Sequence, residues 1–336
     1  MNPNRVTRRR AITILAATAA GLVGGRSDSC PAVGDHEWRG FAMGTDARIV
    51  FAGVGKDAAH SAAAMAAVEI ERLERALSLF RPDSEIVRLN RDKRLPSPSG
   101  DMERALNLAL AIALRTHGLF DPTVQTLWDT YVDWFSTSPD AGIPPQHLIE
   151  RALEAVDWRK LELTSNTARI GDNQRITLNG LGQGYVTDRI ADLLHRRGFV
   201  HVLVDLGEQR ALGPDRDGKP WLIARRGTAA IELSDGALAT SEGAGCVLGA
   251  EGAVHHLFDP RTGRSARHWQ RISVHHRSAA VADALSTAFY AAPAHDIANM
   301  VAKFDGLVVW ATDRHGHEFH WRSDSTIGLE GVRAST

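Results

Sequence analysis

Three closely spaced glycines and the helix that follows them could bind a phosphate. Gly180, Gly182 and Gly184 come after an apolar strand end, and a helical pattern begins at Val186. Glycines allow close backbone approach to an anion, and the first N–H groups of a helix are unpaired and partly positive. The same spacing also suits a tight strand-to-helix turn that binds nothing. It matches neither the dinucleotide-binding pattern G-x-G-x-x-G nor a P-loop, so no standard nucleotide fold is indicated.

A carboxylate and a hydroxyl are placed to bind a hard cation. Asp283 and Thr287 are four residues apart in a strongly helical stretch, which puts both side chains on one face. Carboxylates, hydroxyls and carbonyls are the oxygen ligands that Mg²⁺ prefers. The alternative is that Asp283 sits just inside the helix start and interacts only with the helix dipole.

One histidine, His256, is a candidate proton acceptor. It lies three residues before Asp259 and Pro260, whose turn should hold the segment rigidly. An imidazole with an ordinary pKa near ~6.5 can take a proton from a hydroxyl at neutral pH. The pairs at 255–256 and 275–276 lie in strand-like stretches, where neighbours face opposite ways, so neither pair forms a two-ligand metal site. A purely structural role is the alternative for any one of the 15 histidines.

Two turns combine aromatic rings with hydrogen-bond acceptors. Residues 120–123 (FDPT) and 80–82 (FRP) could hold a planar heterocycle. Simple turn chemistry around a buried phenylalanine explains them equally well. The two cysteines, Cys30 and Cys246, form no metal motif, and no G-x-S-x-G elbow is present.

The elements that would position these residues alternate irregularly between strand and helix. We expect a strand or hairpin over 38–51, a short turn over 84–90, and short strand-like segments over 161–178 that lead into the three glycines. Helices are expected at 56–80, from Ser99 or Asp101 to 116, and at 124–135, 144–156, 186–198, 279–291 and 297–303. This mixture predicts an α+β fold with mixed, largely antiparallel sheets packed with helices. Without repeats or a low-complexity linker, residues 36–330 are expected to form a single catalytic unit.

Composition and the N-terminus indicate an exported globular protein. The 336 residues are 43% hydrophobic and 24% charged, and the net charge of -1 gives no reason to expect a nucleic-acid partner. Arginines at 5 and 8–10 precede an apolar stretch and the small residues Gly24 and Gly25. This layout predicts a twin-arginine-like export signal over residues 1–30, and therefore a periplasmic location.

Six motifs, in order along the chain, together resemble the ApbE-type FAD:protein FMN transferases. They lie at residues 43–45 (MGT), 79–90 (LFRPDSEIVRLN), 118–123 (GLFDPT), 177–188 (TLNGLGQGYVTD), 256–263 (HLFDPRTG) and 282–287 (ADALST). The resemblance implies an enzyme that takes FAD as substrate and Mg²⁺ as cofactor. Such enzymes move the FMN half of FAD onto a Thr or Ser hydroxyl of an acceptor protein and release AMP.

The resemblance also assigns roles to individual residues. The catalytic residues would be His256, which would act as the base or close to it, and Asp259 of the same motif. The metal would be held by the Gly180 carbonyl, Asp283 and Thr287. The residues implied to contact FAD are Met43, Phe80, Leu119, Phe120, Asp121, Thr177, Gln183 and Leu257.

Four positions depart from the family's usual pattern. Phe80 stands where tyrosine is usual, Thr177 where aspartate is frequent, and Gln183 where lysine or glutamate is usual. Glu208 follows Gly207 where Gly-Gly-Asp is more frequent. The leader together with Asn179, Gln183 and Glu208 resembles a NosX-like periplasmic branch, whose acceptor would be a NosR-like protein or a redox membrane-complex subunit. The alternatives are an FAD pyrophosphatase that yields FMN and AMP, and a non-catalytic periplasmic flavin-binding protein.

Overall fold

The computed structural model describes residues 35–138, 142–225, 228–249 and 254–323. The predicted export signal and Cys30 lie outside these residues, so the signal stays a prediction. Within the described ranges, no helix has both the length and the apolar character needed to cross a bilayer.

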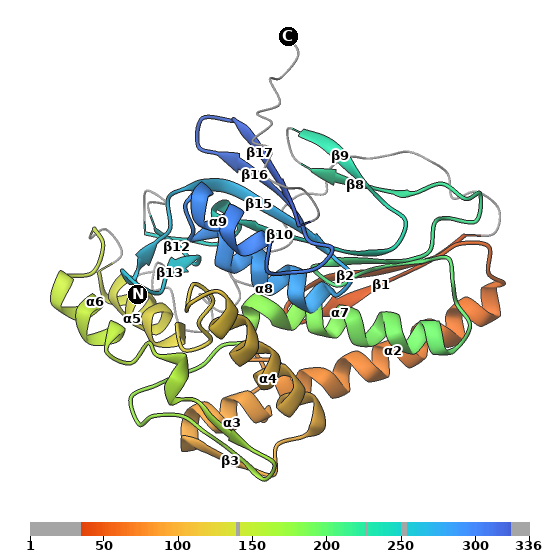
Figure 1. The fold of residues 1–336 in the computed structure, drawn as a ribbon. Helices are drawn as coiled ribbons and strands as arrows, with labels where there is room; N and C mark the ends of the chain where they lie inside the picture. The colour runs from red at the N-terminus through yellow and green to blue at the C-terminus, as the bar shows by residue number, and fades with distance from the viewer. Residues whose placement is uncertain (1–34, 139–141, 226–227, 250–253, 324–336) are drawn as a thin grey trace, which may run out of the picture.

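A large sheet of eight strands forms the centre of the fold (Figure 1). Every neighbouring pair in it is antiparallel, which confirms the predicted α+β class. Its strands, in spatial order, are β1 (His36–Ala42), β2 (Thr45–Phe51), β6 (Val202–Asp205), β7 (Gln209–Leu212), β10 (Gly236–Glu242), β15 (Trp269–His276), β16 (Val308–Asp313) and β17 (Glu318–Arg322).

Both faces of this sheet are covered, because successive strand residues point to opposite sides. Val202 and Val204 of β6 belong to the main core, with the helices α7 (Asn179–Arg196) and α8 (Ala279–Tyr290). Leu203, between them, packs on the opposite face against a separate hairpin of β8 (Trp221–Arg225) and β9 (Thr228–Leu233). Figure 1 shows the two helices under the sheet and the hairpin beyond its other side.

Shorter elements surround this centre. The helices are α2 (Lys56–Leu77), α3 (Glu85–Asp92), α4 (Gly100–Arg115), α5 (Gln125–Thr137), α6 (Gln146–Leu153) and α9 (Ala294–Val301). The small strands are β3 (Arg94–Pro96), β4 (Glu162–Thr164), β5 (Thr167–Arg169), β11 (Val247–Leu248), β12 (Val254–His255), β13 (Phe258–Asp259) and β14 (Arg264–Ser265).

Two local predictions are settled by helix caps. The expected short turn over 84–90 is wrong: the segment forms helix α3, whose start is capped by Ser84 Oγ accepting from the Val87 N–H at 3.3 Å. Of the two proposed caps for α4, Ser99 is the cap, because its Oγ accepts from the Met102 N–H at 3.3 Å.

The three glycines lie inside helix α7 rather than in a turn before it. The expected strand approach ends at Arg169, and the helix begins at Asn179, seven residues before the expected Val186. A Cβ on Gly184 would lie 2.3 Å from the Ala279 carbonyl oxygen, and one on Gly180 would lie 3.1 Å from Thr287 Oγ1. Gly184 therefore lets α7 and α8 pack backbone against backbone in opposite directions, and Gly180 leaves room for the Thr287 side chain of α8. This packing offsets the poor helix propensity of glycine.

Candidate active site

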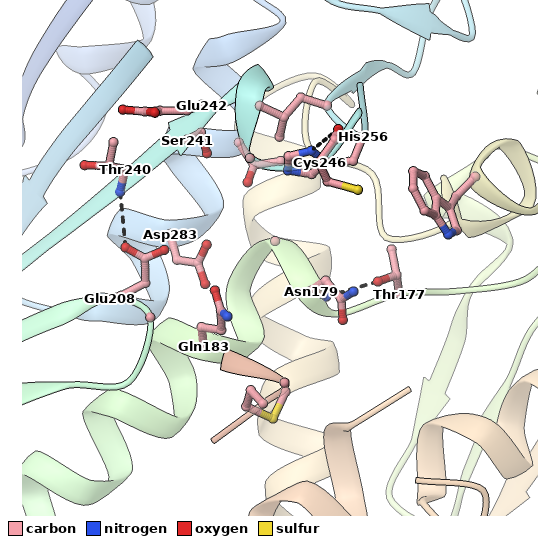
Figure 2. Close-up of a pocket in the computed structure, with 18 of the residues that line it drawn as sticks. Thr177, Asn179, Gln183, Glu208, Thr240, Ser241, Glu242, Cys246, His256 and Asp283 are labelled. Atoms are coloured by element: carbon pink, nitrogen blue, oxygen red, sulfur yellow. Dashed lines mark hydrogen bonds between the residues drawn. The ribbon is translucent and has the colours of Figure 1, made fainter. Parts of the chain in front are cut away.

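One large cavity of about 1410 Å³ collects the predicted site residues. All eight residues implied to contact FAD line it, as do the three implied metal ligands and His256. Asp259 does not line it. Figure 2 shows Asp283, Gln183 and Glu208 on one side, with His256 and Cys246 across from them.

The contact between α7 and α8 brings three oxygen donors together. The Gly184 N–H donates to Asp283 Oδ2 at 3.0 Å, whereas a regular helix would give that hydrogen to the Gly180 carbonyl. Gly180 is also the residue that packs against Thr287. No described residue donates to Asp283 Oδ1 or bonds to the Thr287 hydroxyl. A carboxylate, a carbonyl and a hydroxyl thus lie close together with unused bonding capacity.

The charge on Asp283 is unfavourable in its surroundings. The side chain is only 4% exposed, and this burial, reinforced by the negative charge of Asp188 and opposed by the Gly184 N–H, raises its pKa to about 7. Glu208, 6% exposed, has its pKa raised by burial and then by the charge of Asp283, although its Oε2 accepts from the Thr240 N–H at 3.1 Å. A bound cation would relieve both penalties.

No group of three or more His, Cys, Asp or Glu side chains forms a metal cluster in the described part of the chain. A cation at this place would therefore need the Gly180 carbonyl and the Thr287 hydroxyl besides Asp283. This all-oxygen set suits a hard cation such as Mg²⁺ better than zinc.

The start of α8 is held by an aspartate from α7. Asp188 Oδ1 accepts from the Ala279 N–H at 2.8 Å, and its Oδ2 accepts from the Ala280 N–H at 3.1 Å and Ser278 Oγ at 2.6 Å. Arg210 pairs with the same carboxylate at 2.6 Å. Asp283 itself lies in the second turn of α8, so the alternative that it caps the helix dipole is wrong.

His256 faces the cavity as a neutral imidazole. Its backbone N–H donates to the Cys246 carbonyl at 3.2 Å, and its Nδ1 lies 3.3 Å from the same oxygen. A carbonyl only accepts, so Nδ1 carries the hydrogen and Nε2 keeps its lone pair. Burial lowers the pKa of His256 to about 4, well below the ordinary value expected from the sequence. The neighbouring His255 contacts the Ala266 carbonyl at 2.8 Å and has a structural role.

Asp121 lines the cavity, but both of its oxygens are used by neighbouring protein groups. Oδ1 accepts from the Thr123 N–H at 2.8 Å and the Thr123 hydroxyl at 2.6 Å, and Oδ2 accepts from the Trp158 N–H at 3.1 Å. Burial raises the pKa of Asp121, and the hydrogen bonds from Thr123 and Trp158 oppose this rise. The carboxylate therefore fixes the shape of the loop that presents Leu119 and Phe120.

Asp259 is engaged outside the cavity. Its Oδ1 accepts from both the N–H and Nε of Arg261 at 2.9 Å, and its Oδ2 accepts from Nη2 of the same side chain at 2.9 Å. Asp259 thus stabilises the turn after His256 and has no position from which to touch a ligand in the large cavity.

Another wall of the same cavity is lined by residues that were not predicted from the sequence. It carries arginines that contact acids: Arg48 lies 3.4 Å from Asp205, and Arg271 pairs with Glu242. Including the predicted residues, the lining holds seven carboxylates and four guanidiniums. Arg175 lies 3.0 Å from Asp129, and Arg225 lies 3.9 Å from Glu318. Because its cations are already paired, the cavity favours an anionic ligand that arrives with a metal ion.

Trp128 also lines the cavity and packs against Phe258, with ring centroids 6.5 Å apart. No local sequence signal marks Trp128 or the arginines and acids of this wall, since they come from separate strands and helices and none of them belongs to a recognisable motif.

The fold and the site together define an α+β protein with one deep, acidic cavity built for a large ligand. The chain belongs to the ApbE family, whose model matches residues 43–310.

Relatives and solved structures agree with this assignment. The chain is 26% identical to the FAD:protein FMN transferase of Klebsiella pneumoniae, over 84% of this chain and 86% of that protein. It is also 26% identical to the FAD:protein FMN transferase of Haemophilus influenzae, over 86% of this chain and 89% of that protein. The ApbE protein of Thermotoga maritima superposes with a TM-score of 0.74 at 25% identity, covering 86% of this chain and 97% of that one. The flavin transferase ApbE of Vibrio cholerae superposes with a TM-score of 0.74 at 21% identity, covering 87% of this chain and 97% of that one.

Proposed function

We propose that this chain is an FAD:protein FMN transferase that transfers the FMN half of FAD to a Thr or Ser hydroxyl of an acceptor protein and releases AMP. The observation that carries the proposal is the meeting of Asp283, Thr287 and Gly180 with His256 around one cavity. Two relatives that match 84% and 86% of this chain, over 86% and 89% of their own length, are named FAD:protein FMN transferase.

In this reaction the acceptor oxygen forms a bond to the FMN phosphorus. The bond from that phosphorus to the oxygen bridging toward AMP breaks, and AMP leaves with the electron pair. The hydroxyl proton goes to Nε2 of His256, which is neutral at pH 7 because its pKa is lowered to about 4.

Asp283, Thr287 and the Gly180 carbonyl would hold Mg²⁺. When bound, Mg²⁺ would neutralise charge on the pyrophosphate, the principal requirement of phosphoryl transfer. Because the arginines that line the cavity already pair with acids, the metal would supply this neutralisation. Asp188 keeps the first turn of α8 fixed, and so keeps Asp283 and Thr287 in place relative to Gly180.

The other predicted residues would hold the organic parts of FAD. Phe80, Phe120 and Met43 supply apolar surface for a planar ring system. The Met43–Gly44 turn has positive φ at both residues, and Gly44 is so close to Phe80 that a Cβ there would lie 2.8 Å from the ring. Thr177 and Gln183 offer neutral hydrogen-bonding groups.

Location and acceptor complete the proposal. The twin-arginine-like leader supports export to the periplasm. There, a NosR-like protein or a redox membrane-complex subunit would supply the hydroxyl.

A single incubation tests the activity. The mature protein, FAD, Mg²⁺ and an acceptor domain are combined, and all products are identified by mass spectrometry. The proposal predicts covalent FMN on the acceptor together with AMP. Free FMN with AMP would instead show a pyrophosphatase, and unchanged FAD with an authentic acceptor would show a flavin-binding protein.

A further inference from the structure

Strand β8 meets the cavity with its edge. Four consecutive residues, 222–225, line the cavity. Side chains alternate between the faces of a strand, so one face could contribute only every second residue. A strand that contributes four in a row borders the cavity with its backbone.

The side chains of β8 lie on two faces, one packed against the large sheet and one exposed. Trp221 and Ile223 pack against the large sheet, and Arg225 lies 5.9 Å from the ring of Trp310. Leu222 points outward and is 69% exposed. Beyond the pairing with β9, no backbone hydrogen bond of residues 222–225 reaches another described residue.

The outward side of this edge carries neither charge nor proline. Exposed edges commonly carry lysine or proline, whereas the outward residues here are Leu222 and Ala224, and the one charge of the strand, Arg225, lies on the inward face beside Trp310. A register shift between Ile223 and Arg225 marks a bulge, a feature often found beside active sites.

We propose that the free edge of β8 binds the acceptor polypeptide as an added β-strand and so delivers its hydroxyl to the cavity. This inference rests on the proposed function, because that reaction requires a hydroxyl of a large molecule to enter a deep site. An extended segment can enter while the rest of its protein stays outside. Strand addition satisfies the backbone groups of both partners, and the Leu222 side chain packs on an apolar residue of the segment.

The test separates acceptor binding from FAD binding. A strain that lacks the gene for this chain is complemented with the wild-type chain, Leu222→Lys or Val68→Lys. Val68 is a matched control, since it is an exposed apolar residue (71%) on α2, away from the cavity. The initial rate of covalent FMN incorporation is read from in-gel flavin fluorescence of denatured protein, with each variant quantified. The Kd for FAD and the Tm are measured on the purified variants.

We expect Leu222→Lys to slow incorporation by about tenfold, the effect of losing one buried leucine contact. Its Kd for FAD should stay within about twofold and its Tm unchanged. Val68→Lys should match the wild type. Undiminished incorporation by Leu222→Lys, or an equal loss of FAD affinity, would overturn the docking site. If the wild-type chain yields no covalent flavin above the deletion strain, the proposed function itself fails.

Discussion

Two buried aspartates, both from motifs and both in the cavity lining, differ in what surrounds them. Asp121 accepts hydrogen bonds from three donors, two from Thr123 in its own loop and one from Trp158, and they satisfy both of its oxygens. Asp283 accepts from one N–H, and its neighbours include the acids Asp188 and Glu208. An acid with a full set of donors builds structure, whereas an acid left with open capacity beside other acids is suited to hold a cation.

Asp283→Asn should give the largest loss of activity. The amide keeps the size of the side chain but removes the charge that would bind Mg²⁺, so we expect FMN transfer to fall by about 10³-fold. The Tm should hold or rise, because a buried charge is removed. Transfer assays and thermal melting measure both effects. Activity close to that of the wild type would remove Asp283 from the metal site.

His256→Ala should slow transfer by about 10²-fold. This is the lower end of the range for general bases, since an imidazole with a pKa of about 4 is a weak base. The Kd for FAD should change little. The exposed His268 provides the control, and His268→Ala should transfer at the wild-type rate. Transfer by His256→Ala at the wild-type rate would show that another group takes the proton.

The stability of the metal-free protein should depend on pH through Asp283. Its pKa is about 7 in the folded chain and ~3.9 when unfolded, so the folded state binds the proton more tightly. The resulting stabilisation is complete below about pH 4 and is lost as the pH rises through about 7, by up to about 1.4 kcal/mol per pH unit.

Denaturant titrations of the wild type and Asp283→Asn measure this contribution together with its effect on Glu208, because His256 contributes to both proteins. The free energy of unfolding of the wild type relative to the variant should fall between pH 4 and 7. Mg²⁺ should reduce the fall, since it binds the charged carboxylate. A pH-independent difference would contradict the raised pKa.

Asp121→Asn should act on stability rather than on chemistry. The amide nitrogen cannot accept from the Trp158 N–H, so the free energy of unfolding should drop by about 1–3 kcal/mol. Transfer by the folded fraction should remain within about tenfold of the wild type. A loss of transfer as large as that of Asp283→Asn would erase the distinction between the two aspartates.

Asp259→Asn should have the smallest effect. Its carboxylate binds Arg261 outside the cavity, so we expect a loss of about 1 kcal/mol in stability and transfer within a few-fold of the wild type. A large fall in the transfer rate with FAD affinity unchanged would restore the sequence-based catalytic role.

Local patterns predicted much of the fold. The hairpin of β1 and β2 follows from alternating apolar residues around Gly44, and the Ser99 cap follows from its position before an apolar helix. The helical start of α7 could not be read from a stretch with three glycines. Those glycines fit a helix because α8 packs directly on the Gly184 backbone and the side chains of Thr287 and Met43 lie against Gly180 and Gly182. This is a tertiary effect that local propensity does not contain.

The site was predicted where motifs carry it and missed where only topology does. His256 and Asp283 both line the cavity, and the sequence singled them out because each lies in a recognisable pattern. The pairs of Arg271 with Glu242 and Arg48 with Asp205 were missed, since sheet pairing brings together strands far apart in sequence. Asp259 shares the motif of His256, yet motif membership does not determine whether a side chain faces the cavity.

The central claim is that Gly180, Asp283 and Thr287 hold one divalent cation beside FAD. Crystals grown with FAD and Mn²⁺ in place of Mg²⁺ test it directly through anomalous diffraction. We expect one Mn²⁺ peak within coordination distance of the Gly180 carbonyl, an Asp283 carboxylate oxygen and Thr287 Oγ1. A peak bound to other residues, or FAD bound with no peak at this place, would contradict the account.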